Sequence, residues 1–167
     1  MSTRVKVSRL VVAAVIGISG AVLLAASPHY KKGGQPVCTA SGATVTCSTG
    51  QVAGLGNFDV EVSISFTATQ GQTCHNPGNG NAVPGQNPAT GTGGAGLSIP
   101  AGDIKNGTLT VPSISGTATI TASSSEGAGC PGASWTVTLD GPITVTGGTY
   151  TFESPPGTVI PQLSFSF

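Results

Sequence analysis

Few residues of this sequence have types and spacings that suit catalysis. Asp59 and Glu61 lie two positions apart in a segment of alternating polarity, so both side chains face the same side of a strand. Two neighbouring carboxylates are what glycoside hydrolysis requires, which makes an extracellular carbohydrate-active hydrolase one alternative function. We favour the other interpretation, a solvated strand face on which acidic side chains discourage edge-to-edge pairing.

A histidine-based mechanism needs a nucleophile, a base and an orienting group. His75 is the only plausible base, because His29 follows the N-terminal export segment, and the sequence contains no Gly-x-Ser-x-Gly motif. An exposed loop histidine is the simpler interpretation of His75. We therefore predict that the protein is not an enzyme, has no catalytic residue and binds no cofactor.

Four cysteines, Cys38, Cys47, Cys74 and Cys130, allow three disulfide pairings, and the sequence does not select one. The segment from Cys38 to Cys47 has the length of a hairpin with Ser41-Gly42 near its turn. Facing Cβ atoms in a hairpin lie about 4.5–5.5 Å apart, close to what a disulfide needs. We therefore favour Cys38–Cys47 together with Cys74–Cys130. The spacings of 8, 26 and 55 intervening residues lack the close pairs of a zinc site, so no metal is expected.

The N-terminus has the form of an export signal. Residues 1–9 carry three basic residues and no acid, and residues 10–26 form a run of 17 apolar and small residues. Such a segment is either a cleaved secretory signal or an uncleaved anchor that holds the following domain at the cell surface. We predict a signal or anchor over 1–26, a linker over 27–35 and a disulfide-bonded domain over 36–167.

From residue 36 onward the polarity alternates with a period of two, which is typical of strands with one buried face. The clearest case is 58–69, where the odd-numbered residues are polar. The even-numbered residues, predicted to face the core, are Phe58, Val60, Val62, Ile64, Phe66 and Ala68. The same alternation recurs over 117–122, 135–140, 143–146, 149–153 and 163–167, and Trp135 is expected in the core on this basis.

Turn signals separate these segments: Asp140-Gly141-Pro142, Gly147-Gly148 and Pro155-Pro156-Gly157. About eight short strands joined by such turns indicate an all-β fold. We expect a single antiparallel β-sandwich, immunoglobulin-like or related, with a small β-barrel as the alternative.

The segment 70–96 is the exception, because its many Gly, Asn and Pro residues predict a long loop. Long loops on a rigid scaffold commonly carry the binding surface of a domain. The candidate contact residues in this loop are His75, Asn76, Asn79, Asn81, Gln86 and Asn87.

Several short motifs occur in a characteristic order: Cys74-His-Asn-Pro-Gly78, Pro84-Gly-Gln-Asn-Pro88, Ile104-Lys-Asn-Gly107, and Cys130-Pro131 followed by Trp135. Over about residues 58–140 the sequence resembles a group of small secreted bacterial proteins with no assigned function. The resemblance implies export and a β domain, and it implies no catalytic residue. It also adds support to the Cys74–Cys130 pairing, because the two motifs come as a set.

Charge restricts the class of partner. Without residues 1–26, three basic and six acidic residues remain, which gives a net charge of −3. Nucleic acid is not expected as a partner, since neutralising phosphates requires clustered Lys and Arg. We predict a secreted or surface-anchored interaction protein for an unknown extracellular or envelope ligand. A structural, self-assembling surface protein is a further alternative, because threonine-rich strands with little charge can pair at their edges.

Overall fold

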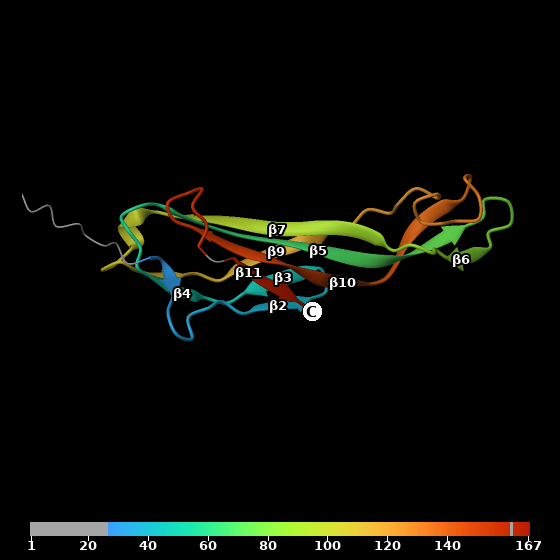
Figure 1. Ribbon diagram of the computed structural model, residues 1–167. Coiled ribbons are helices and arrows are strands. Elements are labelled where there is room, and N and C mark those ends of the chain that lie inside the picture. The colour runs from blue at the N-terminus through green and yellow to red at the C-terminus, as the bar shows by residue number, and fades with distance from the viewer. Residues whose placement is uncertain (1–26, 161) are drawn as a thin grey trace, which may run out of the picture.

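The computed structural model describes residues 27–160 and 162–167, so the predicted signal or anchor lies outside the described residues (Figure 1). The described chain is built almost entirely of strands, with one turn of 3-10 helix at Ala101–Asp103. The strands are β1 (His29–Tyr30), β2 (Cys38–Ser41), β3 (Thr44–Cys47), β4 (Gly50–Ala53), β5 (Val60–His75), β6 (Ala82–Pro84), β7 (Ala89–Ile99), β8 (Thr108–Val111), β9 (Ile114–Thr119), β10 (Thr136–Glu153) and β11 (Leu163–Ser166).

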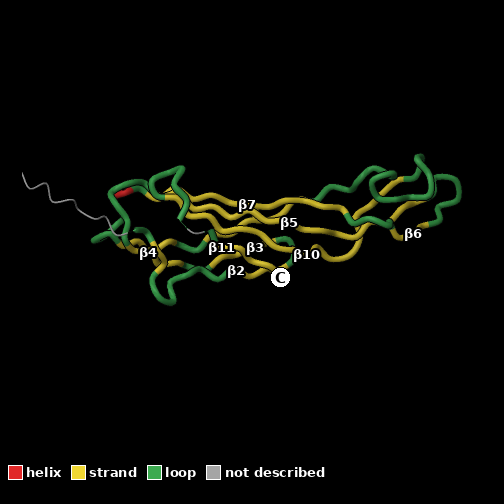
Figure 2. The backbone as a smooth tube through the Cα atoms, viewed as in Figure 1, coloured by secondary structure: helices red, strands yellow, loops and turns green. Residues whose placement is uncertain are grey.

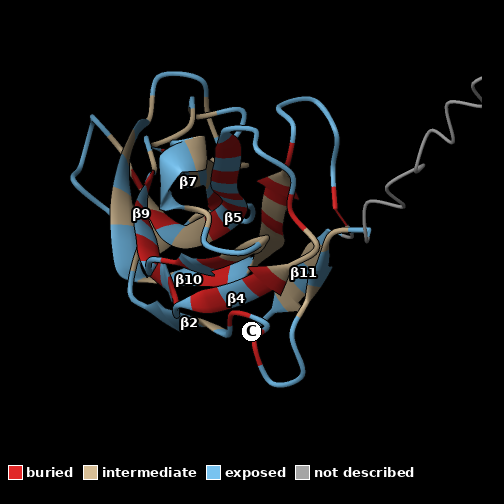
Figure 3. Cartoon of the chain, turned by 90° about the vertical axis from the view of Figure 1, so that its left-hand side faces the viewer, coloured by how far each residue is buried: buried red, intermediate tan, exposed pale blue. Residues whose placement is uncertain are grey.

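The strands form two sheets, which confirms the all-β class. A small sheet has the order β1-β4-β8, and the large sheet has the order β11-β10-β5-β7-β9-β3-β2, with β6 paired to β5. The large sheet curls into a nearly closed, barrel-like antiparallel sheet, and the small sheet lies across one of its ends (Figure 3). This arrangement corresponds to the expected small barrel and not to the two facing layers of a sandwich.

The main core lies inside the curved sheet, and β5 is its central strand. Val60, Val62, Ile64, Phe66 and Ala68 are each at most 2% exposed, while the residues between them face outward, as the alternation predicts. Phe58, predicted to continue this buried row, is 54% exposed. The prediction is wrong there because β5 starts only at Val60, so no neighbouring strand covers Phe58.

The outer face of the large sheet is lined with hydroxyl groups. One row of paired residues crosses all seven strands of the order given above. Its members are Ser164, Thr149, Ser65, Gly94, Thr117, Thr44 and Ser41. Neighbouring hydroxyls in this face bond to one another, as Thr44 and Thr117 do at 3.0 Å and Thr67 and Thr146 do at 2.8 Å. The predicted polar face is therefore confirmed, and it is uncharged over most of its area.

Two predicted turns in the C-terminal third are wrong. β10 runs without interruption through Asp140-Gly141-Pro142 and through Gly147-Gly148. At both places its register against β5 shifts, and Gly141 has a φ of +72° and Gly147 a φ of +155°. These glycines permit bulges within one strand instead of reversals between two strands. The third predicted turn, at Pro155-Pro156-Gly157, is confirmed by the hydrogen bond from the Ser154 N–H to the Thr158 carbonyl at 3.0 Å.

The predicted long loop over 70–96 is also wrong in its main feature. β5 extends to His75, and β7 pairs with it along eleven residues from Ala89 to Ile99. Glycine in β7 looks like a loop signal, but it leaves space for side chains of the neighbouring strand: the ring of Phe66 lies where a Cβ on Gly93 would stand. The residues 27–35, expected to be a linker, include β1.

Two further strand expectations need correction. β9 ends at Thr119, so Ile120 and Ala122 lie outside the strand, although Ile120 is half-buried and still packs against the main core. Trp135 precedes β10, is half-buried and lies outside the main core, because the end of β10 where it sits extends beyond the curved part of the sheet (Figure 1). The Cys38–Cys47 disulfide is confirmed, and its cysteines face each other in the β2–β3 hairpin.

Two phenolic hydroxyl groups are buried at the end of the core near the small sheet. Tyr150 is 1% exposed, and Tyr30 packs edge-on against Phe152 with ring centroids 6.5 Å apart. Neither hydroxyl has a hydrogen-bond partner among the described residues. Burial raises the pKa of Tyr30 to about 12, and burial together with the nearby Tyr30 raises the pKa of Tyr150 still further.

These pKa shifts predict a loss of stability in alkali. The folded protein holds both phenolic protons more tightly than the unfolded chain, whose tyrosines titrate near a pKa of about 10. Their contribution to stability is therefore complete below about pH 10 and is lost as the pH rises through the folded pKa values. We expect the free energy of unfolding, measured in urea, to fall across this range. Tyr150→Phe should flatten the fall and leave stability at pH 7 unchanged or higher. An equally steep fall in the variant would contradict the assignment.

Candidate functional site

The predicted contact residues lie at the end of the molecule remote from the small sheet. β5 and β10 extend beyond the core and carry a group of turns there, on the right in Figures 1 and 2. We call this part the distal lobe and define it as residues 72–88 and 120–138. The lobe has few buried apolar residues of its own, among them Cys74 and Ala128, which are both 0% exposed.

The tip of the lobe is the turn 76–81 between β5 and β6, and asparagines shape it. The Asn76 side-chain oxygen accepts a hydrogen bond from the Gly78 N–H at 2.8 Å, and the Asn79 side-chain oxygen accepts one from the Asn81 N–H at 3.1 Å. The backbone N–H of Asn76 donates to the Asn81 carbonyl at 2.9 Å. Asn79 and Asn81 are exposed, so the turn is an ordered, uncharged, polar surface.

His75 is the last residue of β5 and is half-buried. Its Nε2 atom lies 2.9 Å from the Thr138 hydroxyl on β10, and no carboxylate is among its hydrogen-bond partners in the described chain. This contact links the two long strands at the base of the turn. The observed environment supports a structural role for His75.

Gln86 and Asn87 are exposed, but they also bond to loop 120–135 and so help to hold the lobe together. Their backbone N–H groups donate to the Ala128 carbonyl at 2.8 and 3.2 Å, and the Asn87 side-chain amide donates to the Gly127 carbonyl at 3.0 Å. The structure therefore brings segment 85–88 against loop 120–135, a contact that sequence reasoning did not anticipate.

Gln72 is the residue that the sequence analysis missed. It is 4% exposed and its amide nitrogen donates to the Asn87 carbonyl at 3.0 Å and to the Ser123 hydroxyl at 3.2 Å. Its side-chain oxygen accepts a hydrogen bond from the Ser123 N–H at 2.6 Å. A buried amide is stable only with such partners. Nothing in the local sequence distinguishes Gln72 from Gln70, which makes one bond to the Gly141 carbonyl.

The Cys74–Cys130 disulfide, the second favoured pairing, is confirmed and closes the lobe. It joins the end of β5 to loop 120–135 with a Cα–Cα distance of 5.7 Å. Together with the Gln72 bonds, it fixes three segments of the lobe that have little apolar surface to bury. The two disulfides indicate an oxidising environment.

The two carboxylates of the hydrolase alternative have different environments. Asp59 precedes β5, and its carboxylate accepts a hydrogen bond from the Ala101 N–H at 2.9 Å at the start of the 3-10 helix. Glu61 lies within β5, directly opposite Ser98 on one side and Glu153 on the other. The Asp59 carboxylate therefore caps a neighbouring turn, which is a structural role.

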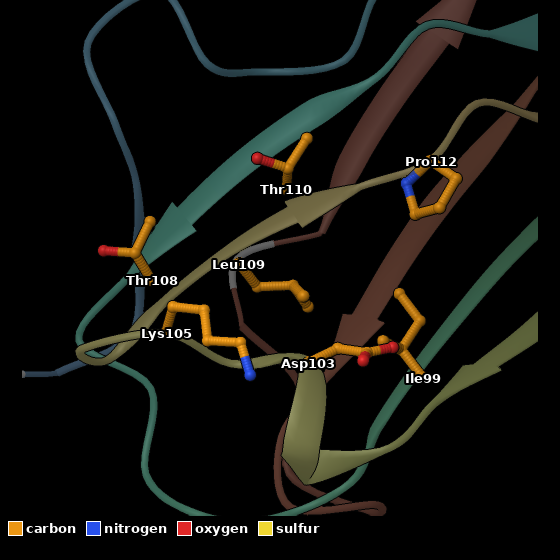
Figure 4. A pocket seen from close by; sticks show the side chains of 7 residues that line it. All are labelled: Ile99, Asp103, Lys105, Thr108, Leu109, Thr110 and Pro112. Atoms are coloured by element: carbon orange, nitrogen blue, oxygen red, sulfur yellow. The ribbon is translucent and has the colours of Figure 1, made fainter.

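A pocket lies beside the small sheet, whose strand β8 contributes three of its lining residues (Figure 4). It is a shallow, open hollow of about 420 Å³ lined by Ile99, Asp103, Lys105, Thr108, Leu109, Thr110 and Pro112. The Lys105 ammonium group donates to the Gly102 carbonyl at 2.6 Å. A second hollow of about 260 Å³ is lined by residues of 55–57 together with Ile104 and Gly107. Neither hollow includes a predicted contact residue.

Across residues 27–160 and 162–167, no three His, Cys, Asp or Glu side chains are grouped so that they could hold a metal ion. Within the same ranges, no helix has the length and apolar character needed to cross a membrane. Comparison of the chain with protein-family models, with curated proteins and with solved structures gives no match.

Proposed function

We propose that the protein is a non-enzymatic extracellular interaction protein and that the distal lobe is its contact surface. The observation that carries the proposal is the construction of the lobe: two long strands project an exposed, uncharged turn away from the core, and a disulfide holds it. Secretion, or anchoring at the cell surface through residues 10–26, is part of the proposal and accords with the disulfide bonds.

The order of the turn favours binding. Asn76 and Asn79 already bond to the backbone of the turn, so its conformation is held before a ligand arrives. A contact surface that is held in advance loses less conformational entropy on association, which leaves more of the interaction energy for affinity.

The chemistry of the turn limits the partner. Residues 70–96 contain no Asp, Glu, Lys or Arg, and the turn 76–81 offers amide groups and backbone polar groups to solvent. Such a surface recognises a neutral partner with hydrogen-bonding groups, such as an uncharged polysaccharide or an uncharged polar protein surface. Strong dependence of binding on salt is not expected, because few charges are involved.

The test introduces a bulky charge at the tip of the lobe. We expect Asn81→Arg to reduce retention of the secreted protein on envelope preparations of the producing cells by about tenfold, as the loss of one or two hydrogen bonds would. The matched control is Thr110→Arg, since Thr110 is exposed in a strand and lines the pocket at the other end. Normal retention of Asn81→Arg combined with loss in Thr110→Arg would place the contact in the pocket and contradict the proposal.

A further inference from the structure

Among residues 27–160 and 162–167, the large sheet stops short of closure, and its edge strands β11 and β2 each pair with only one neighbour. Seven strands follow one another in the order β11-β10-β5-β7-β9-β3-β2, and each neighbouring pair is antiparallel. With an odd number of alternating strands, the first and the last run in the same direction. One additional strand that runs opposite to both would complete a closed, fully antiparallel barrel, which removes free edges altogether.

One continuous row of paired residues connects the two edges. The row of paired residues described above leads from Ser164 on β11 through every intermediate strand to Ser41 on β2. Each edge strand is four residues long. We call the place where this nearly closed sheet remains unpaired, between the edge strands β2 and β11, the seam.

The core is less well covered at the seam than elsewhere. Val45 and Tyr150, which face inward one strand away from the edges, are at most 1% exposed. Their partners in the edge strands are Ala40, which is exposed, and Leu163, which is half-buried. Burial therefore falls off from the interior of the sheet to both edges, so an additional strand would cover apolar side chains.

On the side away from β3, the backbone of β2 pairs with no strand of the described part of the chain. In antiparallel pairs, residues that do not exchange hydrogen bonds have the closer Cα atoms. Cys38 and Cys47 have a Cα–Cα distance of 3.9 Å, so they form such a pair, and by alternation Ala40 and Val45 form the next. The N–H and C=O groups of Cys38 and Ala40 are therefore directed away from β3 and toward the seam.

Neither edge strand is protected by charge or by proline. Exposed edges are normally blocked by such residues, by bulges or by being very short, and shortness is the one of these protections that β2 and β11 have. The strand sequences are Cys-Thr-Ala-Ser in β2 and Leu-Ser-Phe-Ser in β11, without charge or proline. An uncharged edge matches an uncharged partner strand, because a charged side chain would lose its hydration there without gaining an ion pair.

We propose that the seam binds one extended, uncharged peptide segment of a partner protein, which becomes a strand antiparallel to β2 and β11. Its alternate side chains are apolar and meet Ala40, Leu163 and Phe165, and its backbone bonds to backbone groups of the two edges. This is strand addition, in which backbone hydrogen bonds supply affinity and alternate side chains supply specificity. The seam is a second surface, separate from the distal lobe.

The test uses the full chain with both disulfides intact. The probe is a fluorescent peptide of about seven residues, a usual strand length, with alternating threonine and valine and blocked ends. We expect fluorescence anisotropy to report binding, and hydrogen exchange of the Cys38 and Ala40 amides to slow when the peptide is added. A peptide with proline at its centre should bind about tenfold more weakly, since it lacks one backbone donor.

Two variants locate the site. Ala40→Pro removes an N–H group that β3 does not use, and Ala40→Lys places a charge at the edge; each should weaken peptide binding about tenfold, as the loss of one hydrogen bond would. Asn81→Arg, the lobe variant, should bind the peptide like the wild type, so failures of the two proposals are distinguishable. Unchanged binding in both Ala40 variants would overturn the inference.

Hydrogen exchange of the protein without peptide can also contradict the inference. If the Cys38 and Ala40 amides are protected at every protein concentration without peptide, the chain itself fills the seam. If their protection grows with protein concentration, a second copy pairs there. Either result, or the absence of any anisotropy change, would overturn the assignment to a partner peptide.

Discussion

Removing the Cys74–Cys130 disulfide, by replacing both cysteines with alanine, is expected to lower the free energy of unfolding by roughly 4 kcal/mol. The bond joins residues 56 positions apart, so its loss restores a large amount of conformational freedom to the unfolded chain. The distal lobe has little apolar surface to compensate, because its buried contacts centre on the Gln72 amide. We expect loop 120–135 to open first, before the main core unfolds.

Urea denaturation followed by circular dichroism measures this effect, and hydrogen exchange of the Ser123 and Ala128 amides reports the opening of the loop. The matched control replaces Cys38 and Cys47 by alanine. That disulfide spans only 9 positions in a hairpin that the chain forms locally, so its loss should cost less, roughly 3 kcal/mol. A larger effect in the control pair would mean that the β2–β3 hairpin, not the lobe, depends most on its disulfide.

Gly93→Ala is expected to destabilise the protein by about 1–3 kcal/mol, the usual cost of forcing an extra methyl group into a packed core. In the register of the large sheet, Phe66 lies between Gly93 on β7 and Gly148 on β10. A Cβ on Gly93 would overlap the Phe66 ring and lie 2.7 Å from the Ala118 nitrogen. Phe66 is 2% exposed, so moving its ring aside would disturb other packed core residues.

Gly96→Ala is the control in the same strand. The nearest atom to a Cβ there is the Val62 carbonyl oxygen at 4.0 Å, and Gly96 has no positive φ. Alanine at this position should leave stability unchanged or raise it by about 0.4–1 kcal/mol, since it restricts the unfolded chain. Thermal unfolding of both variants checks the pair of expectations. Equal effects would show that Gly93 is present for another reason than the space it leaves for Phe66.

How well the sequence predicts the structure depends on the type of residue. Alternation of large apolar residues with polar ones predicted β5, because only one periodicity places Val60, Val62, Ile64 and Phe66 on one face. Glycine was ambiguous. At Gly93 and Gly148 it leaves space for a side chain of another strand, yet in the sequence it has the form of a loop or a turn. Which meaning applies depends on a residue that is distant along the chain.

The distal lobe also contains some features that the sequence predicted and others that it did not. Asparagine and glycine over 76–81 were part of the predicted long loop, and this part does form a turn, because both residues tolerate the backbone conformations of turns and Asn bonds to nearby N–H groups. The glycine-rich segment 89–96 has the composition of the same loop, although it is part of β7. The role of Gln72 was not predictable, since its partners Asn87 and Ser123 lie 15 and 51 positions away. A buried amide is recognised only when its environment is known.

The sequence by itself determined the all-β class, the buried face of β5, the Cys38–Cys47 hairpin and the weak charge of the surface, because these follow from local alternation, local spacing and composition. Tertiary structure alone decided the curled sheet, the continuity of β10, the lobe built around Gln72 and the seam between β2 and β11. Each of these depends on which strands become neighbours. Strand pairing is a contact between segments far apart in the chain, and local polarity does not encode the partner.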